Sequence, residues 1–303
     1  MSRIRIGSRG SLLAQAQSNW VKQQLMQRYA DLEVELTIIK TRGDQMVDQP
    51  ITNTAGKGVF TKEIEDALLR NDIDIAVHSL KDLPTELPAG LAIAAVPRRE
   101  DARDVLVSRD RQGLKDLPRR ARLATSSLRR QAQLLHGRAD LLLVPIRGNI
   151  DTRLRKLNEG EVDALVMAAA GLKRIGRAEC ITEYLPDEVC VSAVAQGALG
   201  IEARDDGAMA ALLTFVHDAN TEAEVAAERA LLERLGAGCH VPVGARARVE
   251  GDTLRMIGVV AKPDGKSLCK GIIEGRSTIA REIGRRLADQ LLKNGAAKIL
   301  GLT

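Results

Sequence analysis

The sequence predicts an α/β protein with two similar lobes, followed by a smaller α+β domain. Strand-like and helix-like segments alternate over roughly the first two hundred residues, which is the order expected of parallel sheets. One type of strand-to-helix turn occurs in both halves of that region, and the last third changes to antiparallel patterns. With 303 residues, the chain has room for two or three domains of roughly 150 residues or fewer, each with its own core.

The first lobe is predicted from a βαβ order that favours an open, mostly parallel sheet. Arg3–Ile6 is typical of a strand, and Ser11–Tyr29 of a helix that follows a Gly- and Ser-containing turn. Glu33–Lys40 alternates as a strand with one buried face does. Thr61–Arg70 indicates a further helix, and Ile73–Val77 a buried strand.

The second lobe repeats this order after Pro97. Its predicted elements, in turn strand, helix, strand, helix and strand, are Arg122–Thr125, Ser127–Leu135, Leu141–Ile146, Ile150–Leu157 and Val162–Met167. The two lobes also begin alike, because Ile6–Arg9 with Ala14–Gln17 resembles Ala124–Ser127 with Arg130–Gln133. This similarity indicates a structural duplication, with two lobes facing a cleft.

The C-terminal third predicts a small α+β domain. Val241–Val249, Thr253–Ala261 and Ser267–Ile273 are typical of antiparallel strands, joined by turns that contain Gly, Asp and Pro. A helix from Thr278 to about Lys293 closes the chain. Cys239 falls in a Gly-rich loop before the first of these strands.

The composition favours a small polyanionic ligand over nucleic acid. The chain has 45 basic and 40 acidic residues, and 32 of the basic residues are Arg, whose planar guanidinium pairs bidentately with carboxylate or phosphate. Two Phe, two Tyr and one Trp leave few side chains for base stacking. No apolar run approaches the roughly 20 residues of a membrane span, and no signal peptide begins the chain, so we expect a cytoplasmic protein. Neither the four cysteines nor the four histidines show metal-ligand spacing.

Three predicted strand-to-helix turns carry arginines, where the carboxyl ends of parallel strands bind ligands. Thr125–Arg130 brings free N–H groups, three hydroxyls and two arginines to one helix start, although an ordinary capped helix with solvated arginines fits equally well. Arg147 and Arg153 follow the next strand, and Arg9 lies at the corresponding turn of the first lobe, with Ser11 beside it. A single Arg is commonly a surface charge, but three such turns favour an anion site.

Two further positions are candidates for chemistry. Asp82, beside Lys81, follows an apolar strand, and a carboxylate there can stabilise developing positive charge or pass a proton. A simple turn Asp before Pro84 is the plainer interpretation of the local pattern alone. Cys239 lies on a flexible loop as a reactive thiol does, but it has a poor general base in His240, because adjacent residues of an extended segment point to opposite sides.

Taken together, these segments resemble the porphobilinogen deaminase (hydroxymethylbilane synthase) family over essentially the whole chain. The co-occurrence of the motifs at family-like spacing carries the resemblance. They are Arg9–Gln17, Gly56–Glu63, His78–Pro84, Thr125–Arg130, Arg147–Arg153, Ala169–Arg174, Gln196–Glu202 and the Cys239 loop.

The resemblance implies two periplasmic-binding-protein-like lobes flanking a cleft, and a third domain. The implied boundaries are 1–97 with 200–219, then 98–199, then 220–303. It also implies a transferase of tetrapyrrole and haem biosynthesis, cytoplasmic and monomeric. The enzyme would deaminate four porphobilinogen molecules, join them head to tail on a dipyrromethane primer, and release the linear tetrapyrrole hydroxymethylbilane by hydrolysis. The dipyrromethane cofactor would be attached to Cys239 through a thioether.

The resemblance further implies roles for individual residues. Asp82 would be catalytic. The residues implied to bind the cofactor are Cys239, Lys81, Asp82, Thr125, Ser126, Ser127, Arg129, Arg130, Arg147 and Gly148. Those implied to bind the substrate and the growing chain are Arg9, Ser11, Lys57, Ser79, Arg147, Arg153, Arg174 and Gln196.

The main alternative is a non-catalytic two-lobed protein that binds a small anion, which would account for the lobes and arginines but not for Cys239 or Asp82. A nucleic-acid-binding protein has only the basic charge in its favour. A cysteine-nucleophile hydrolase lacks a placed histidine base. We expect no partner other than porphobilinogen, and neither nucleic acid nor membrane.

Overall fold

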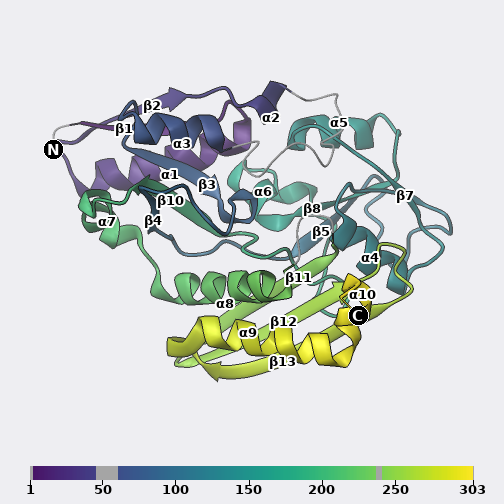
Figure 1. The fold of residues 1–303 in the computed structure, drawn as a ribbon. Coiled ribbons are helices and arrows are strands. Elements are labelled where there is room, and N and C mark those ends of the chain that lie inside the picture. The colour runs from purple at the N-terminus through teal and green to yellow at the C-terminus, as the bar shows by residue number, and fades with distance from the viewer. Residues whose placement is uncertain (1–2, 46–60, 237–240, 303) are drawn as a thin grey trace. The chain divides into compact units, whose positions relative to one another are not determined.

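The computed structural model describes residues 3–45, 61–236 and 241–302 (Figure 1). It divides into two compact units, Met1–Arg99 with Ala198–Ala219, and Glu100–Gly197 with Asn220–Thr303. The first unit contains one α/β sheet, and the second contains another α/β sheet together with the C-terminal antiparallel sheet. The predicted fold class, two α/β lobes and an α+β domain, is confirmed.

The sheet of the first unit has the strand order β2-β1-β3-β10-β4 in the described part of the chain. The strands are β1 (Arg3–Ser8), β2 (Glu33–Ile38), β3 (Ile75–Ser79), β4 (Leu91–Ala95) and β10 (Leu199–Arg204). β1 pairs in parallel with β2 and β3, as predicted, whereas β10 runs antiparallel between β3 and β4. The sequence pattern did not show β10, because this strand reaches the sheet from about 120 residues beyond β3.

Helices cover both faces of this sheet because successive side chains of a strand point to opposite sides. On one face, Val21 and Leu25 of α1 share a core with Ile75 of β3. On the other face, Ile64 and Leu68 of α3 form a second core with the residues around β3. The helical segments of this unit are α1 (Leu12–Arg28), α2 (Arg42–Gln45), α3 (Lys62–Leu69), η1 (Leu80–Asp82), α7 (Ala208–Leu213) and η3 (Thr214–Val216).

The α/β sheet of the second unit repeats this plan, with the described strands in the order β7-β6-β8-β5-β9. They are β5 (Asp104–Ser108), β6 (Arg122–Ala124), β7 (Leu142–Val144), β8 (Ala164–Ala168) and β9 (Glu183–Tyr184). β6 pairs in parallel with β7 and β8, and β5 runs antiparallel between β8 and β9. Each sheet thus has three parallel strands, then one antiparallel strand, then an edge strand, which supports the duplication.

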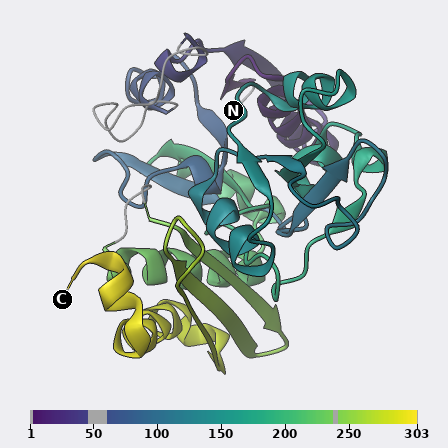
Figure 2. The ribbon, with the colours of Figure 1, turned by 90° about the vertical axis from the view of Figure 1, so that its right-hand side faces the viewer.

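The C-terminal strands β11 (Val243–Glu250), β12 (Thr253–Ala261) and β13 (Leu268–Arg276) form an antiparallel meander. Figure 2 shows these strands with the last helices alongside. α8 (Ala219–Leu235) and α9 (Ala280–Leu291) share one hydrophobic core with the sheet. The remaining helical segments of the second unit are α4 (Leu128–Gly137), α5 (Ile150–Asn158), α6 (Ala169–Arg174), η2 (Ala178–Cys180), η4 (Ser277–Ile279), the π-helical segment η5 (Leu292–Ala296) and α10 (Ala297–Leu300).

The close crossing of α8 and α9 depends on Gly284. A Cβ at this position would lie 2.0 Å from the carbonyl oxygen of Ala227, so the helices would have to separate. We predict that Gly284→Ala lowers the free energy of unfolding by about 1–3 kcal/mol in urea titrations, as overpacking does. Gly137→Ala is the matched control, because nothing lies within 4 Å of a Cβ at Gly137. Equal stability of the two variants would contradict this account of the helix crossing.

Candidate active site

The first unit forms a pocket at the carboxyl ends of two neighbouring parallel strands. β1 ends at Ser8 and leads into α1, whose N-cap is Ser11; β3 ends at Ser79 and leads into the short helix η1. The pocket, together with the solvent space at its mouth, has a volume of about 430 Å³. Its lining residues are Arg9, Ser11, Leu13, Ala14, Gln17, Thr61, Val77, His78, Ser79 and Asp82.

Four residues predicted for the site, Arg9, Ser11, Ser79 and Asp82, therefore line one pocket. Lys81 is exposed on the same turn but does not line the pocket. The sequence interpretation did not single out Gln17, which orients Ser79: its Nε2 donates a hydrogen bond of 2.9 Å to Ser79 Oγ. Lys57 lies outside the described residues.

The backbone of η1 holds Asp82 at the surface of the pocket. The amide of Leu80 donates to the carbonyl oxygen of Ala198, just before β10, at 3.0 Å. Leu80 and Leu83 are buried on either side of the exposed Asp82. The apolar neighbours anchor the turn, and the carboxylate is left accessible to a ligand.

A buried acidic cluster lies between α3 and the sheet, next to this pocket. Nε2 of His78 lies 2.9 Å from Oε2 of Glu202 on β10, and Glu202 is fully buried. On α3, burial raises the pKa of Glu65 above its ordinary value, despite a hydrogen bond with Thr61, and the charge of Glu202 raises it further. The sheet under the pocket is thus crosslinked by ionisable groups rather than by apolar contacts alone.

The raised pKa of Glu65 predicts a specific pH dependence. The stability that Glu65 contributes is fully present below the ordinary glutamate pKa of 4.5, and is lost as the pH rises through the higher pKa of the folded state. We therefore expect the unfolding free energy of the wild type, minus that of Glu65→Gln, to fall as the pH rises above 4.5. Urea titrations at several pH values measure this difference, and a constant or rising difference would contradict the assignment.

In the second unit, the turn after β6 uses its hydroxyls to hold the backbone. Ser127 is the N-cap of α4. Ser126 Oγ donates to the carbonyl oxygen of Ile146 at 2.7 Å and accepts from the amide of the same residue at 2.9 Å. Thr125 is buried, and its Oγ1 accepts from the amide of Ser127 at 3.3 Å. The helix start predicted as an anion cradle is thus a capped turn whose hydroxyls bond to the backbone.

Arg129 and Arg130, on the first turn of α4, are buried around one carboxylate. Nη1 of Arg129 donates to Oδ2 of Asp104 at 2.6 Å, and Nε and Nη2 of Arg130 donate to Oδ1 at 3.0 and 2.7 Å. The exposed fractions of Arg129, Arg130 and Asp104 are 6%, 7% and 0%. Burial alone would raise the pKa of Asp104, but the two guanidiniums outweigh it and hold that pKa well below the usual range.

Gln196 belongs to the same cluster, since its Nε2 donates to Oδ1 of Asp104 at 2.9 Å and to the carbonyl oxygen of Ala102 at 2.8 Å. The thiol of Cys190 donates to Oδ2 at 3.4 Å. Burial, reinforced by the charge of Asp104, raises the pKa of this thiol to about 12, so Cys190 stays a protonated packing residue. Asp104 was not among the residues predicted from the sequence. Its signal there is an acidic residue at the start of an apolar strand, in a chain whose paired arginines need a counter-charge.

The turn after β7 supplies Gly148, with a φ of +100°, and Asn149, the N-cap of α5. Nε of Arg153 donates to the carbonyl oxygen of Gly148 at 2.9 Å. Burial lowers the pKa of Arg153, and the positive charge of Arg130 lowers it further. Arg147 is exposed on this turn. The repulsion between Arg130 and Arg153 means that the two predicted arginine turns of this unit converge on one electropositive region.

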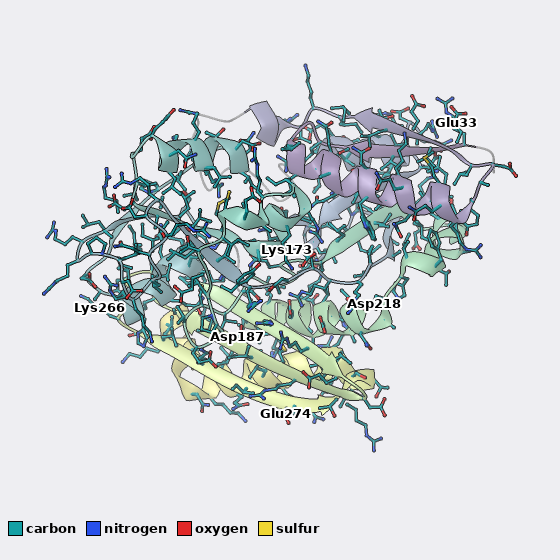
Figure 3. The ribbon with its side chains drawn as sticks, turned by 180° about the vertical axis from the view of Figure 1, so that it is seen from behind. Glu33, Lys173, Asp187, Asp218, Lys266 and Glu274 are labelled. Carbon is teal, nitrogen blue, oxygen red and sulfur yellow. The ribbon has the colours of Figure 1, made fainter. Side chains whose placement is uncertain are left out.

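Arg174, at the end of α6, donates from Nη2 to the carbonyl oxygen of Gly197 at 2.6 Å. Burial lowers its pKa to about 10. The nearby carboxylate of Glu100 is held instead by Lys173, labelled in Figure 3, whose Nζ lies 2.6 Å from Oε1. Within the described residues, neither Arg153 nor Arg174 forms a salt bridge with a carboxylate, so the second unit buries more positive than negative charge at this edge.

Such an excess of partly buried guanidinium groups suits a ligand that carries several carboxylates. The described residues contain no group of three or more His, Cys, Asp or Glu side chains placed to hold a metal ion. Among the helices that the structure describes, none has the length and apolar character needed to cross a membrane. Cys239 lies outside the described residues.

The fold and these sites define a class, a protein of two α/β sheets and an α+β domain whose strand-to-helix turns carry groups suited to carboxylates. Family models identify the member of that class: "porphobilinogen deaminase, dipyromethane cofactor binding domain" matches residues 4–211, and "porphobilinogen deaminase, C-terminal domain" matches residues 222–293. The chain belongs to the porphobilinogen deaminase family.

Similar proteins agree with this assignment over nearly the full length. The chain is 50% identical to a porphobilinogen deaminase of Trichlorobacter lovleyi over 299 residues, which are 98% of this chain and 96% of the relative. It is also 50% identical to one of Geotalea uraniireducens over 300 residues, 98% of this chain and 93% of the relative.

Solved structures with similar folds include the methionine-binding protein MetQ (TM-score 0.45, 14% identity, 71% of this chain and 89% of that one). Another is the aliphatic sulphonate-binding protein SsuA of Escherichia coli (TM-score 0.41, 16% identity, 77% and 70%). The fold assignment itself rests on the strand orders and pairings of the two α/β sheets.

The chain is accordingly an enzyme with the activity of a hydroxymethylbilane synthase, a transferase of tetrapyrrole biosynthesis with a dipyrromethane cofactor. The alternative of a non-catalytic anion-binding protein is not favoured, because the full-length relatives are named for a deaminase.

Proposed function

We propose that the Asp82 pocket of the first unit carries out the deamination and coupling of porphobilinogen, and that the arginine cluster of the second unit holds the carboxylates of dipyrromethane. The observation that carries this proposal is the buried charge: Asp104 neutralises one of the two guanidiniums on α4, and Arg153 adds another. Each pyrrole of the cofactor brings an acetate and a propionate, which supply the missing negative charge.

The donor set fits this cofactor. Guanidiniums and free amides at the N-termini of α4 and α5 are the groups that bind carboxylates most strongly. Arg129, Arg130, Arg147 and Lys81, with the turn residues Thr125, Ser126, Ser127 and Gly148, would hold it, and the thiol of Cys239 would form the thioether. When bound, the cofactor supplies the free pyrrole carbon to which the first porphobilinogen molecule is joined.

The substrate chemistry gives Asp82 its role. Loss of ammonia breaks the C–N bond of the aminomethyl group and leaves a methylene carbon whose positive charge is shared with the pyrrole nitrogen. The carboxylate of Asp82 would stabilise this charge and help move the proton released when the new C–C bond forms. The remaining predicted residues would bind the carboxylates of the substrate and growing chain: Arg9, Ser11, Lys57, Ser79, Arg147, Arg153, Arg174 and Gln196.

Intact-protein mass spectrometry tests the attachment. We predict that freshly purified wild type exceeds its sequence mass by two deaminated porphobilinogen units, and that Cys239→Ala does not. Cys180→Ala, a change at a half-buried cysteine of the second unit, is the control and should keep the added mass. Wild type that stays unmodified after incubation with porphobilinogen would refute the proposed cofactor attachment.

Substitution of Asp82 tests the catalytic role. We predict that Asp82→Asn lowers kcat by roughly 10²–10⁴-fold, the usual contribution of a positioned acid–base group. The added mass of the cofactor should remain in this variant. Asp72→Asn is a matched control, because Asp72 is an exposed carboxylate of the same unit, paired with Arg70. If Asp82→Asn turned over at the rate of this control, the assignment would be wrong.

We also propose three domains, 1–97 with 200–219, 98–199 and 220–303, in a monomer that works in the cytoplasm without nucleic-acid or membrane partners. The scarcity of aromatic residues supports the exclusion of nucleic acid, because two Phe, two Tyr and one Trp offer few stacking surfaces. The first family model matches up to residue 211 and the second begins at residue 222, which supports a domain boundary between these residues.

A further inference from the structure

We propose that Asp104 is a positioning residue that serves as a built-in counter-anion: it keeps Arg129 and Arg130 buried and correctly placed before dipyrromethane is present. The inference rests on the proposed function of the arginine cluster. In the cofactor-free protein, Asp104 alone would balance the charge of the two arginines. Once dipyrromethane has bound, its carboxylates would share that role.

Arg129, Arg130 and two further side chains all donate hydrogen bonds to the carboxylate of Asp104. Oδ1 of Asp104 accepts from Nε and Nη2 of Arg130 and from Nε2 of Gln196, while Oδ2 accepts from Nη1 of Arg129 and from the thiol of Cys190. Asp104 is the first residue of β5, and its exposed fraction is 0%. A carboxylate saturated by internal donors and sealed from solvent cannot be replaced by the ligand, so it stays in place in both the cofactor-free and the loaded protein.

The remaining contacts of the arginines show why an anion is needed. Apart from Asp104, Nη1 of Arg129 donates to the carbonyl oxygen of Val191 at 2.6 Å, and Nη1 of Arg130 to that of Val166 at 3.0 Å. Carbonyl oxygens satisfy hydrogen bonds but carry no net charge. Without Asp104, two like charges would lie buried side by side, with Arg153 close enough to Arg130 to add repulsion.

A consequence follows for the order of events. With Asp104 present, the cofactor-free chain buries its arginines and presents a preformed site, and the residual positive charge attracts the ligand. With Asp104 neutral, the carboxylates of dipyrromethane become the principal counter-anions, so the folded state comes to depend on loading. A purely structural aspartate would behave differently, because its loss would destabilise the cofactor-free and loaded forms equally.

The experiment compares melting temperatures of cofactor-free and loaded protein for wild type and Asp104→Asn. Cofactor-free chains come from a host that makes no porphobilinogen; loading is by added porphobilinogen and is checked by intact mass. We expect the rise in Tm on loading to be at least about 5 °C larger for Asp104→Asn than for wild type. The same rise in both proteins would overturn the proposal.

Asp163→Asn is the matched control, because Asp163 also binds an arginine with both oxygens, Arg122, in the same lobe but at its surface. It should lower the Tm of both forms by the same amount. Asp104→Asn could fail to fold without cofactor, in which case refolding from urea with porphobilinogen gives a second measurement. Recovery of folded, loaded protein supports the proposal, whereas failure with and without porphobilinogen overturns it.

The test separates this inference from the function on which it rests. Wild type that gains no mass would refute the proposed cofactor attachment, and the role of Asp104 would fall with it. Wild type that gains the expected mass while Asp104→Asn shows no larger rise in Tm would refute the role of Asp104 alone.

Discussion

The burial of positively charged guanidinium groups is the constraint on which the second unit depends. An ion of this size loses several kcal/mol of hydration on burial, and at an effective dielectric constant near 20 a contact with one opposite charge returns about 4 kcal/mol. Asp104 makes that contact with two guanidiniums at once, the carbonyl oxygens of Val191 and Val166 accept further hydrogen bonds from the arginines, and the side-chain amide of Gln196 donates to Asp104. The balance is close, and Arg153, whose pKa is lowered by burial and by the charge of Arg130, adds repulsion to this cluster.

The same backbone arrangement positions ligand-binding groups in both units. In each α/β sheet, parallel strands end at one edge, and three of the turns there start a helix whose first amides are capped by a serine or asparagine side chain: Ser11 for α1, Ser127 for α4 and Asn149 for α5. The first unit uses this edge for an accessible carboxylate on η1, and the second uses it for buried guanidiniums. One plan thus places an exposed carboxylate, Asp82, in one unit and buried guanidiniums, Arg129 and Arg130, in the other.

Much of the site could be predicted because its chemistry is local. A strand pattern followed by Gly, Ser and Arg predicts both the turn and the groups it exposes, and the structure brings Arg9, Ser11, Ser79 and Asp82 to one pocket. The residues missed are those whose role is to hold others: Gln17 orients Ser79, and Asp104 pairs with arginines 25 and 26 positions away. The one local signal for Asp104 is its place at the start of an apolar strand, and that signal does not show which residues it contacts.

By itself, the sequence determined most of the helices and parallel strands in their order, the repeated lobe, the excess of arginine and the family, since hydrophobic period, turn residues and motif spacing are properties of short segments. Only the tertiary structure decided which strand completes each sheet, because β10 and β5 pair antiparallel with strands distant in the chain. It also decided which arginines are buried and which stay exposed: Arg129 and Arg130 are enclosed, and Arg147 is not. Burial and charge pairing are set by contacts between distant segments, and those contacts exist only in the folded chain.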